Sequence, residues 1–216
     1  MRLGRPASGF TLVEVMITVF VIAIGLLSAA ALQALSKKAA ADAVQRSSAN
    51  TLAQDILERL RGNRSQLAVY VPAQQRTVDA SNLPTAQVCS STSPCTPAQL
   101  AAYDIDQWWR GLDGAAEKII EGTGSSATRS NAGGLRSPTG CIYRATGSCL
   151  VTVAIAWRGL TAIEQGDANN PDDPTNIGCG IGNADYDDPD QAAGNHRYRR
   201  VLVINANLGE GDPCLP

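Results

Sequence analysis

The feature that most constrains this chain is an apolar run near its N-terminus. From Phe10 to Leu35 there are 26 residues, of which Glu14 is the only charged one. A helix that rises 1.5 Å per residue would make this run about 39 Å long, which is enough to cross a bilayer. A charged side chain at the centre of a bilayer costs roughly 2.5 to 3.5 kcal/mol on insertion scales. The run therefore predicts a membrane helix in which Glu14 has a function.

The residues on either side of the run predict its orientation. Arg2 and Arg5 precede it without any acidic residue, so we expect this leader to stay in the cytoplasm and the rest of the chain to cross outward. The alternative is a secretory signal with a small-residue cleavage site near Ser28-Ala29-Ala30. We favour a retained helix, because ordinary signals lack a glutamate near the start of their apolar core and the helical pattern continues past Ala31.

Beyond Leu35 the pattern becomes amphipathic and continues to about Arg61. Side chains that recur at helical spacing predict one face that packs on a domain. Gly62 and Asn63 then provide a stop signal. The packing face comprises Val44, Ser48, Ala49, Leu52, Ala53, Ile56, Leu57 and Leu60, and the opposite face comprises Asp42, Arg46, Asp55, Glu58 and Arg59.

The rest of the chain predicts a mixture of helix and antiparallel strands. Residues 62–96 are rich in Ser, Thr, Gln and Pro and predict an irregular connection, and Pro97 opens a second helix that we expect to extend to Glu121. Alternating apolar residues at 151–157 and 202–208 predict two half-buried strands, the first preceded by a hairpin from Cys141–Tyr143. The second helix would present an apolar face of Leu100, Tyr103, Trp108, Leu112, Ile119 and Ile120.

All six cysteines lie after residue 85, and their even number suits disulfides in an oxidising compartment. No CxxC pair occurs, which weakens a zinc or redox reading. Short separations favour a bond between Cys89 and Cys95 and a second bond between Cys141 and Cys149. The remaining pair would then be Cys179 with Cys214.

The sequence offers little for catalysis, so we expect neither an enzyme nor a cofactor. His196 is the only histidine, and no hydrolase, metalloprotease or phosphate-binding motif occurs. The stretch from His196 to Arg200 is interpreted as a solvated edge of the last strand, and contact with DNA phosphates is the alternative. For the Trp108-Trp109 pair we favour core filling by one ring and partial cover by the other over a ligand platform.

Two Asp-rich stretches flank Cys179. Their oxygen ligands are of the type that Ca²⁺ prefers, but they lack EF-hand spacing, and turns use the same residues for backbone reasons. We therefore predict no metal site and regard four aspartates as weak calcium candidates only: Asp172, Asp173, Asp185 and Asp187.

The hexapeptide Gly9-Phe10-Thr11-Leu12-Val13-Glu14 resembles the processing motif of type IV prepilins and of the related pseudopilins of type II secretion. The resemblance implies cleavage between Gly9 and Phe10 by a prepilin peptidase and N-methylation of Phe10. It also implies that Glu14 pairs with the terminal ammonium of a neighbouring subunit during assembly. The expected organisation is a cleaved leader at 1–9, a transmembrane and assembly segment at 10–35, an amphipathic half-helix at 36–62 and a globular head at 63–216.

Two further stretches, residues 21–33 and 52–64, resemble minor pilins of the PilV type, the type IV pilus modification proteins. Major pilins commonly have a proline in the first half of this helix, whereas this chain has none before Pro72. The implied fold is α+β, with a long N-terminal helix packed on a small antiparallel sheet and disulfide-stapled loops.

The implied role is priming of a type IV pilus near its tip, in motility and adhesion. The expected partners are other minor pilins, the major pilin, the prepilin peptidase and the inner-membrane assembly platform. We expect a single-pass inner-membrane protein with a periplasmic head, later carried on the cell-surface pilus. The alternatives are a minor pseudopilin of type II secretion and a pilin-anchored adhesive or DNA-binding module.

Overall fold

The computed structural model describes residues 9–115, 117–121, 128–131, 133–145, 147–164, 166, 170 and 173–209. The chain divides into two compact units, one ending at Ala43 and the other beginning at Val44. We call the second unit the head. The predicted α+β fold is confirmed, since a long apolar helix is followed by a four-stranded antiparallel sheet and two described disulfides.

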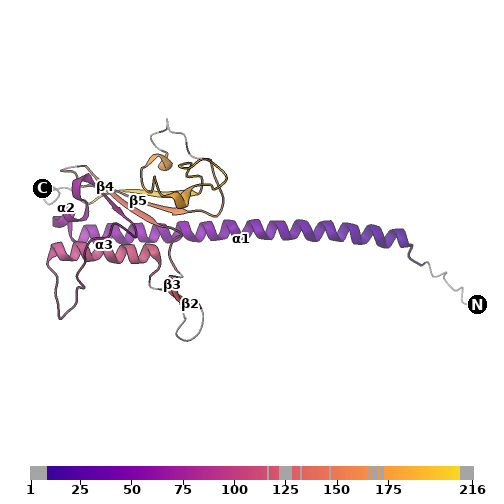
Figure 1. The fold of residues 1–216 in the computed structure, drawn as a ribbon, viewed down its shortest axis with the longest axis horizontal. Coiled ribbons are helices and arrows are strands. Elements are labelled where there is room, and N and C mark those ends of the chain that lie inside the picture. Colours follow the sequence, from indigo (N-terminus) through magenta and orange to yellow (C-terminus); the bar gives the residue numbers. More distant parts are fainter. Residues whose placement is uncertain are drawn as a thin grey trace, which may run out of the picture. The chain divides into compact units, whose positions relative to one another are not determined.

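The helix α1 spans Leu12–Gly62 (Figure 1). The absence of proline and the many alanines and leucines favour this conformation, and the helix ends where Gly62 and Asn63 predicted. Its buried side chains include the large aliphatic residues Ile56, Leu57 and Leu60, which contribute roughly 1.5 to 3 kcal/mol each by leaving water. Val44, which we placed on the packing face, is instead 65% exposed, so the packed stripe begins further along the helix.

The helix α3 spans Pro97–Asp113 and begins with a capping box between Thr96 and Gln99. It ends eight residues before the predicted end at Glu121 (121 − 113), so that prediction is wrong. Gly114 adopts a left-handed conformation at φ +70°, and a Cβ there would lie 1.7 Å from the carbonyl oxygen of Gly133. The close approach of the returning chain therefore requires glycine, and glycine stops the helix.

The connection between α1 and α3 is more regular than its composition predicted. It contains two 3₁₀ turns, the short helix α2 (Leu67–Tyr70) and the strand β1 (Gln75–Val78). A separate hairpin joins β2 (Lys118–Glu121) to β3 (Thr128–Asn131). These strands have four residues each, which is too few for an alternating pattern to stand out.

The main sheet has the order β1-β4-β5-β6, and every neighbouring pair is antiparallel. The strands are β4 (Thr139–Arg144), β5 (Leu150–Arg158) and β6 (Arg199–Asn207). The hairpin from Cys141–Tyr143 and the two later strands were predicted and are confirmed. The inner face of the sheet, formed by residues such as Ile142, Val153 and Ile155, shares one apolar core with α1 and α3.

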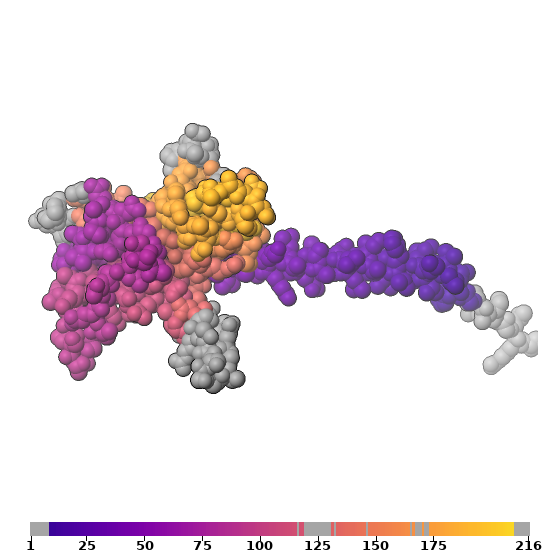
Figure 2. All heavy atoms as spheres, viewed as in Figure 1, coloured from indigo at the N-terminus to yellow at the C-terminus, as the bar shows by residue number. Residues whose placement is uncertain are grey.

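The outer face of the sheet is covered over β5, contrary to the prediction that this strand is half-buried. The second predicted strand alternates as expected at its end, where Asn205 and Asn207 are exposed and Ala206 is buried. Ala154 and Ala156 on β5 are fully buried in a second cluster that includes Tyr186 from the 3₁₀ turn Ala184–Tyr186. The C-terminal residues of the head, in yellow, gather on one side of it in Figure 2. Ala154 and Ala156 are small, so they leave room for Tyr186 and its turn on this face. Because they are small, they also do not stand out in the sequence as a second apolar face.

A polar network inside the core joins the three helices. Asp104 of α3 is 6% exposed; it accepts hydrogen bonds from the Tyr70 hydroxyl and, at 2.9 Å, from Nη1 of Arg59. Burial, followed by the hydrogen bond to this carboxylate, raises the pKa of Tyr70. The sequence predicted Arg59 on the solvent-exposed face of α1. The network could not be predicted, because Tyr70 and Asp104 lie on two other helices.

One of the three predicted disulfides is confirmed. Cys89 bonds to Cys95, but Cys141 bonds to Cys179, so the predicted pairs Cys141–Cys149 and Cys179–Cys214 are both wrong. In the register of β4 and β5, Cys141 lies opposite Ala154. Cys149 is five residues before Ala154 in the chain, which puts it roughly 16 Å from that position at strand spacing. That separation is too large for a disulfide. Cys149 is itself disulfide-bonded, and Cys214 lies outside the described residues.

The outer cluster predicts how stability depends on alkaline pH. Burial raises the pKa of Tyr186 to about 12, while its hydroxyl donates to the Ser137 carbonyl at 2.7 Å. A raised pKa means that this stabilisation is complete below about pH 10, where the unfolded tyrosine starts to ionise, and falls as pH rises toward 12. We expect Tyr186 to make the free energy of unfolding fall by on the order of 2 kcal/mol over this range.

Denaturant titrations of the detergent-solubilised chain at pH 9 to 11.5 would measure the effect. Tyr186→Phe should be less stable at pH 8, because it lacks the hydrogen bonds, yet lose less stability as pH rises. Parallel pH curves for the two proteins would contradict the assignment.

Candidate functional site

The N-terminal end of α1 is organised by its own sequence. Thr11 precedes the first helical residue, and its hydroxyl accepts a hydrogen bond at 3.3 Å from the backbone N–H of Glu14. This satisfies one of the N–H groups that a helix leaves unpaired at its start. Glu14 lies in the first turn, where the helix dipole favours a negative charge. The pair of Thr11 and Glu14 therefore favours a helix that starts here.

The first part of α1 exposes apolar side chains around its circumference. The large ones between Phe10 and Leu35 are from 51% to 84% exposed. By length and composition α1 qualifies as a membrane-crossing helix, and the most apolar 18-residue window has none of its residues buried in the protein. Such a surface is unfavourable in water, so it requires lipid or the helices of other subunits.

The polar groups in this segment fall into two classes. The hydroxyls of Thr18 and Ser28 donate to backbone carbonyls of the same helix, at 2.8 and 2.9 Å, and so need no outside partner. Glu14 differs, because within the part of the chain that the structure describes no cation pairs with its carboxylate. An ion pair with a partner outside the chain would offset the cost of holding that charge in lipid.

The basic stretch at the start of β6 is half-buried except for Arg199, which is buried, so the prediction of a solvated edge is wrong for Arg199. Arg199 is 1% exposed and donates to the carbonyls of Thr175 and, at 3.1 Å, Ile177. Burial lowers the pKa of its guanidinium. Arg199 shares the alternation of Val201 and Val203, which places it on the outer face of the sheet. Its burial could not be predicted, because the sequence does not show that this part of the outer face is covered.

The neighbouring basic residues are also used within the head. Arg197 pairs with Glu164 at 2.8 Å and with Asp188 at 3.4 Å. Arg200 donates to the Thr161 carbonyl at 2.7 Å. These contacts leave little of the cluster available to a nucleic-acid phosphate.

The acidic stretches around Cys179 build turns. Asp187 accepts the backbone N–H groups of Gly194 at 2.7 Å and His196 at 2.9 Å, and these hydrogen bonds lower its pKa. Asp173 likewise accepts from the backbone of Thr175 at 2.8 Å, whereas Asp185 is exposed and Asp172 lies outside the described residues. Across the described ranges no three His, Cys, Asp or Glu side chains form a group suited to a metal ion.

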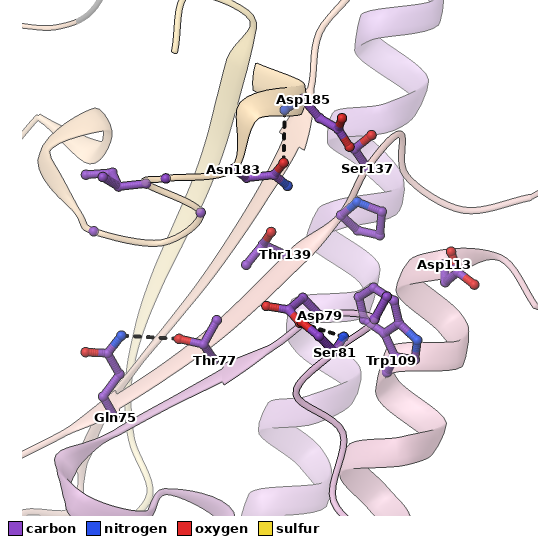
Figure 3. A pocket seen from close by; sticks show the side chains of 16 residues that line it. Gln75, Thr77, Asp79, Ser81, Trp109, Asp113, Ser137, Thr139, Asn183 and Asp185 are labelled. Atoms are coloured by element: carbon purple, nitrogen blue, oxygen red, sulfur yellow. Dashed lines mark hydrogen bonds between the residues drawn. The ribbon is translucent and has the colours of Figure 1, made fainter. Parts of the chain in front are cut away.

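A cavity of about 690 Å³ in the head is lined by residues of β1, the end of α3 and the turns around Gly180 (Figure 3). Its wall is polar and acidic, with Asp79, Asp113 and Asp185 among its side chains and no cationic residue among those that line it. Asp79 stabilises a turn, since its Oδ1 accepts a hydrogen bond from the backbone N–H of Ser81 at 2.8 Å.

The two adjacent tryptophans do not form a common platform. Trp108 is fully buried and its indole N–H donates to the Leu52 carbonyl of α1 at 2.9 Å. Trp109 is 8% exposed and contributes to the cavity wall in Figure 3. Core filling by Trp108 agrees with the prediction, whereas Trp109 is more buried than a partial cover would be.

Comparison with known proteins gives two family matches. A model of the prokaryotic N-terminal methylation motif matches residues 4–30, and a model described as type IV pilin Tt1218 matches residues 31–106. The first match covers the Thr11–Glu14 cap and most of the apolar segment, and the second runs on through the amphipathic part of α1 into α3. No curated protein and no solved structure matches the chain.

The basic stretch yields a stability prediction. Arg199→Ala should lower the free energy of unfolding by about 2 to 4 kcal/mol, because it leaves a cavity and two carbonyls without donors. Arg61→Ala is the matched control, since among the described residues that arginine pairs with the exposed Glu58 alone, and its loss should cost less than about 0.5 kcal/mol. Denaturant unfolding of the solubilised chain would measure both, and equal effects would show that Arg199 has no special structural role.

Proposed function

We propose that this chain, which the two family matches and the fold support as a type IV pilin, is a minor pilin assembled into a type IV pilus. The observation that carries the proposal is the hexapeptide from Gly9 to Glu14, placed at the start of an exposed apolar helix. This arrangement suits a structural protein that assembles through its helix rather than an enzyme.

The proposed maturation removes residues 1–9. A prepilin peptidase cuts between Gly9 and Phe10, and Phe10 becomes the N-methylated first residue. Gly9 suits the cut, because it lies before the helix, outside any regular secondary structure, and has no side chain to obstruct a protease; an added Cβ there meets nothing within 4 Å. Residues 10–35 then form the membrane and assembly segment, 36–62 the amphipathic half-helix and 63–216 the globular head.

The proposed assembly contact pairs two charges in an apolar setting. The carboxylate of Glu14 binds the terminal ammonium of Phe10 in a neighbouring subunit. Each charge alone is costly in lipid, and the pair offsets that cost only when subunits come together. This makes the ion pair a device for selecting correct register between helices whose apolar surfaces are otherwise alike.

The assignment to a minor subunit of the PilV type rests on the resemblance of residues 21–33 and 52–64 and on the absence of proline before Pro72. The role proposed is priming of pilus assembly at or near the tip, in support of motility and adhesion. The partners are the other minor pilins, the major pilin, the prepilin peptidase and the inner-membrane platform. Before assembly the chain is held in the inner membrane with its head in the periplasm, and afterwards it is carried on the pilus.

A minor pseudopilin of type II secretion is the second candidate, because the same N-terminal chemistry supports it. Recovery of the chain from sheared surface fibres would favour the pilus, and co-purification with a secretion platform alone would favour the pseudopilus. A DNA-binding module is less well supported, since the arginines that would serve it make contacts inside the head.

The first test concerns processing. Gly9→Val should abolish cleavage by a co-expressed prepilin peptidase, because a branched side chain obstructs the cut. Gly4→Val, in the same leader but away from the cut, should be processed normally. Intact mass gives the readout, and cleavage of the Gly9→Val chain between the same residues would contradict the proposal.

The second test concerns the ion pair. Glu14→Ala should be processed and inserted in the membrane but recovered from fibres at least about tenfold less, as expected when an ion pair of about 1.4 kcal/mol or more is lost. Glu58→Ala is the matched control, an exposed glutamate of the same helix outside the apolar segment. Normal incorporation of Glu14→Ala would refute the role of the carboxylate.

A further inference from the structure

Among the residues that the structure describes, the last strand of the main sheet, β6, pairs with another strand along one of its two edges only. The sheet order places β6 at the end, next to β5 only. Two backbone hydrogen bonds fix its register, from Leu208 N–H to the Cys149 carbonyl at 3.0 Å and from Gly159 N–H to the Tyr198 carbonyl at 2.7 Å. Bonded pairs alternate along an antiparallel ladder. Even-numbered residues of β6 therefore bond to β5, and odd-numbered residues direct their N–H and C=O groups outward.

The outward groups are available from the middle of the strand onward. They belong to Val201, Val203, Asn205 and Asn207, and among the residues that the structure describes none of their backbone N–H or C=O groups has a hydrogen-bond partner outside the ladder. Asn205 and Asn207 are exposed. This edge therefore offers the alternating donors and acceptors that an added strand needs.

The edge also lacks the devices that keep proteins from pairing through their strands. Residues 201–207, Val-Leu-Val-Ile-Asn-Ala-Asn, contain no charge and no proline, and the pairing with β5 runs without a bulge. Charges, prolines, bulges and short length are the usual protections. The opposite edge of the same sheet has two of them, because β1 is four residues long and contains Arg76. An unprotected strand of this length predicts an edge that is covered in the assembled state.

The topology specifies which direction the covering strand would take. Because all neighbouring strands are antiparallel and the sheet has four of them, β1 and β6 run in opposite directions. Residues 49–60 of α1 contribute to the core of the head, so two heads in which this part of α1 points the same way also have their strands pointing the same way. A second head of this fold placed beside β6 would then present its first strand antiparallel to β6.

We propose that β6 is a docking edge for the first sheet strand of another, non-identical pilin head, which extends the sheet by antiparallel pairing along residues 201–207. This inference rests on the proposed function, since it needs a neighbouring pilin. A second copy of the chain fits less well, because its own β1 has four residues against seven on the edge and carries the Arg76 side chain toward the Tyr70 and Val69 carbonyls.

A photocrosslinking experiment in the native host tests the inference on the full chain. The photoreactive residue p-benzoylphenylalanine replaces Asn207, and adducts from sheared fibres and from membranes are identified by peptide mass spectrometry. The expected product joins Asn207 to a strand peptide of another pilin head. The same probe at Val88, which is 71% exposed on the Cys89 loop, is the matched control and should give no such adduct.

Proline variants test the hydrogen-bond pattern itself. Val203→Pro and Asn205→Pro remove outward N–H groups, so they should keep the head folded and reduce the adduct about tenfold. Leu202→Pro removes an N–H that bonds to β5 and should lower Tm sharply. The use of two outward positions keeps the test informative if one variant does not fold.

The outcomes separate this inference from the proposed function. Incorporation into fibres without a pilin adduct at Asn207, or with an adduct to a second copy or to a protein that is not a pilin, would overturn the docking edge and leave the pilin assignment intact. An adduct to a pilin strand in membranes would support the edge even if fibres contained none of the chain, in which case the assignment to a pilus would fail. Outward proline variants that keep the full adduct would also overturn it.

Discussion

The structure depends on one constraint, which is that a single helix must satisfy two different surroundings. Between Phe10 and Leu35 the side chains of α1 are exposed on all sides and apolar, whereas from Ala49 to Leu60 the same helix has a buried stripe in the core of the head. The change in pattern follows the physics of each setting, since lipid and neighbouring helices demand an apolar surface all round and a protein core demands only one face. Within the first part Glu14 is the only charged residue, and we propose that its carboxylate provides the specificity of assembly.

The head is built so that its outer loops are held without a large apolar core of their own. The Cys141–Cys179 disulfide, the buried Arg199 and the Tyr186 hydroxyl each tie the segment between β5 and β6 to the outer face of the sheet. A segment rich in Asn, Asp and Gly gains little from hydrophobic burial, so covalent and polar contacts take over that role. The consequence is that β5, at the centre of the sheet, is buried on both faces.

The elements that the sequence predicted well are those with long, regular patterns. The helix α1, the hairpin of β4 and β5, and the strand β6 follow from apolar periodicity, and the Cys89–Cys95 bond follows from a short loop. The failures have specific causes. The end of α3 depends on a backbone approach at Gly114, the second disulfide depends on hairpin register, and the burial of Arg199 depends on a cover that is distant in sequence. The Gly9–Glu14 motif, in contrast, is local and needed no tertiary contact to be found.

The central claim is that the chain matures to a pilin whose first residue is Phe10 and whose Glu14 meets a neighbour's new terminus. The most direct measurement is intact mass combined with crosslinking, after co-expression with a prepilin peptidase and the other minor pilins. Our account predicts a chain that begins at N-methylated Phe10 and crosslinks to other minor pilins through the apolar part of α1. A chain that keeps its leader, or is cut near Ala30, or forms no contact with the other pilins, would contradict it.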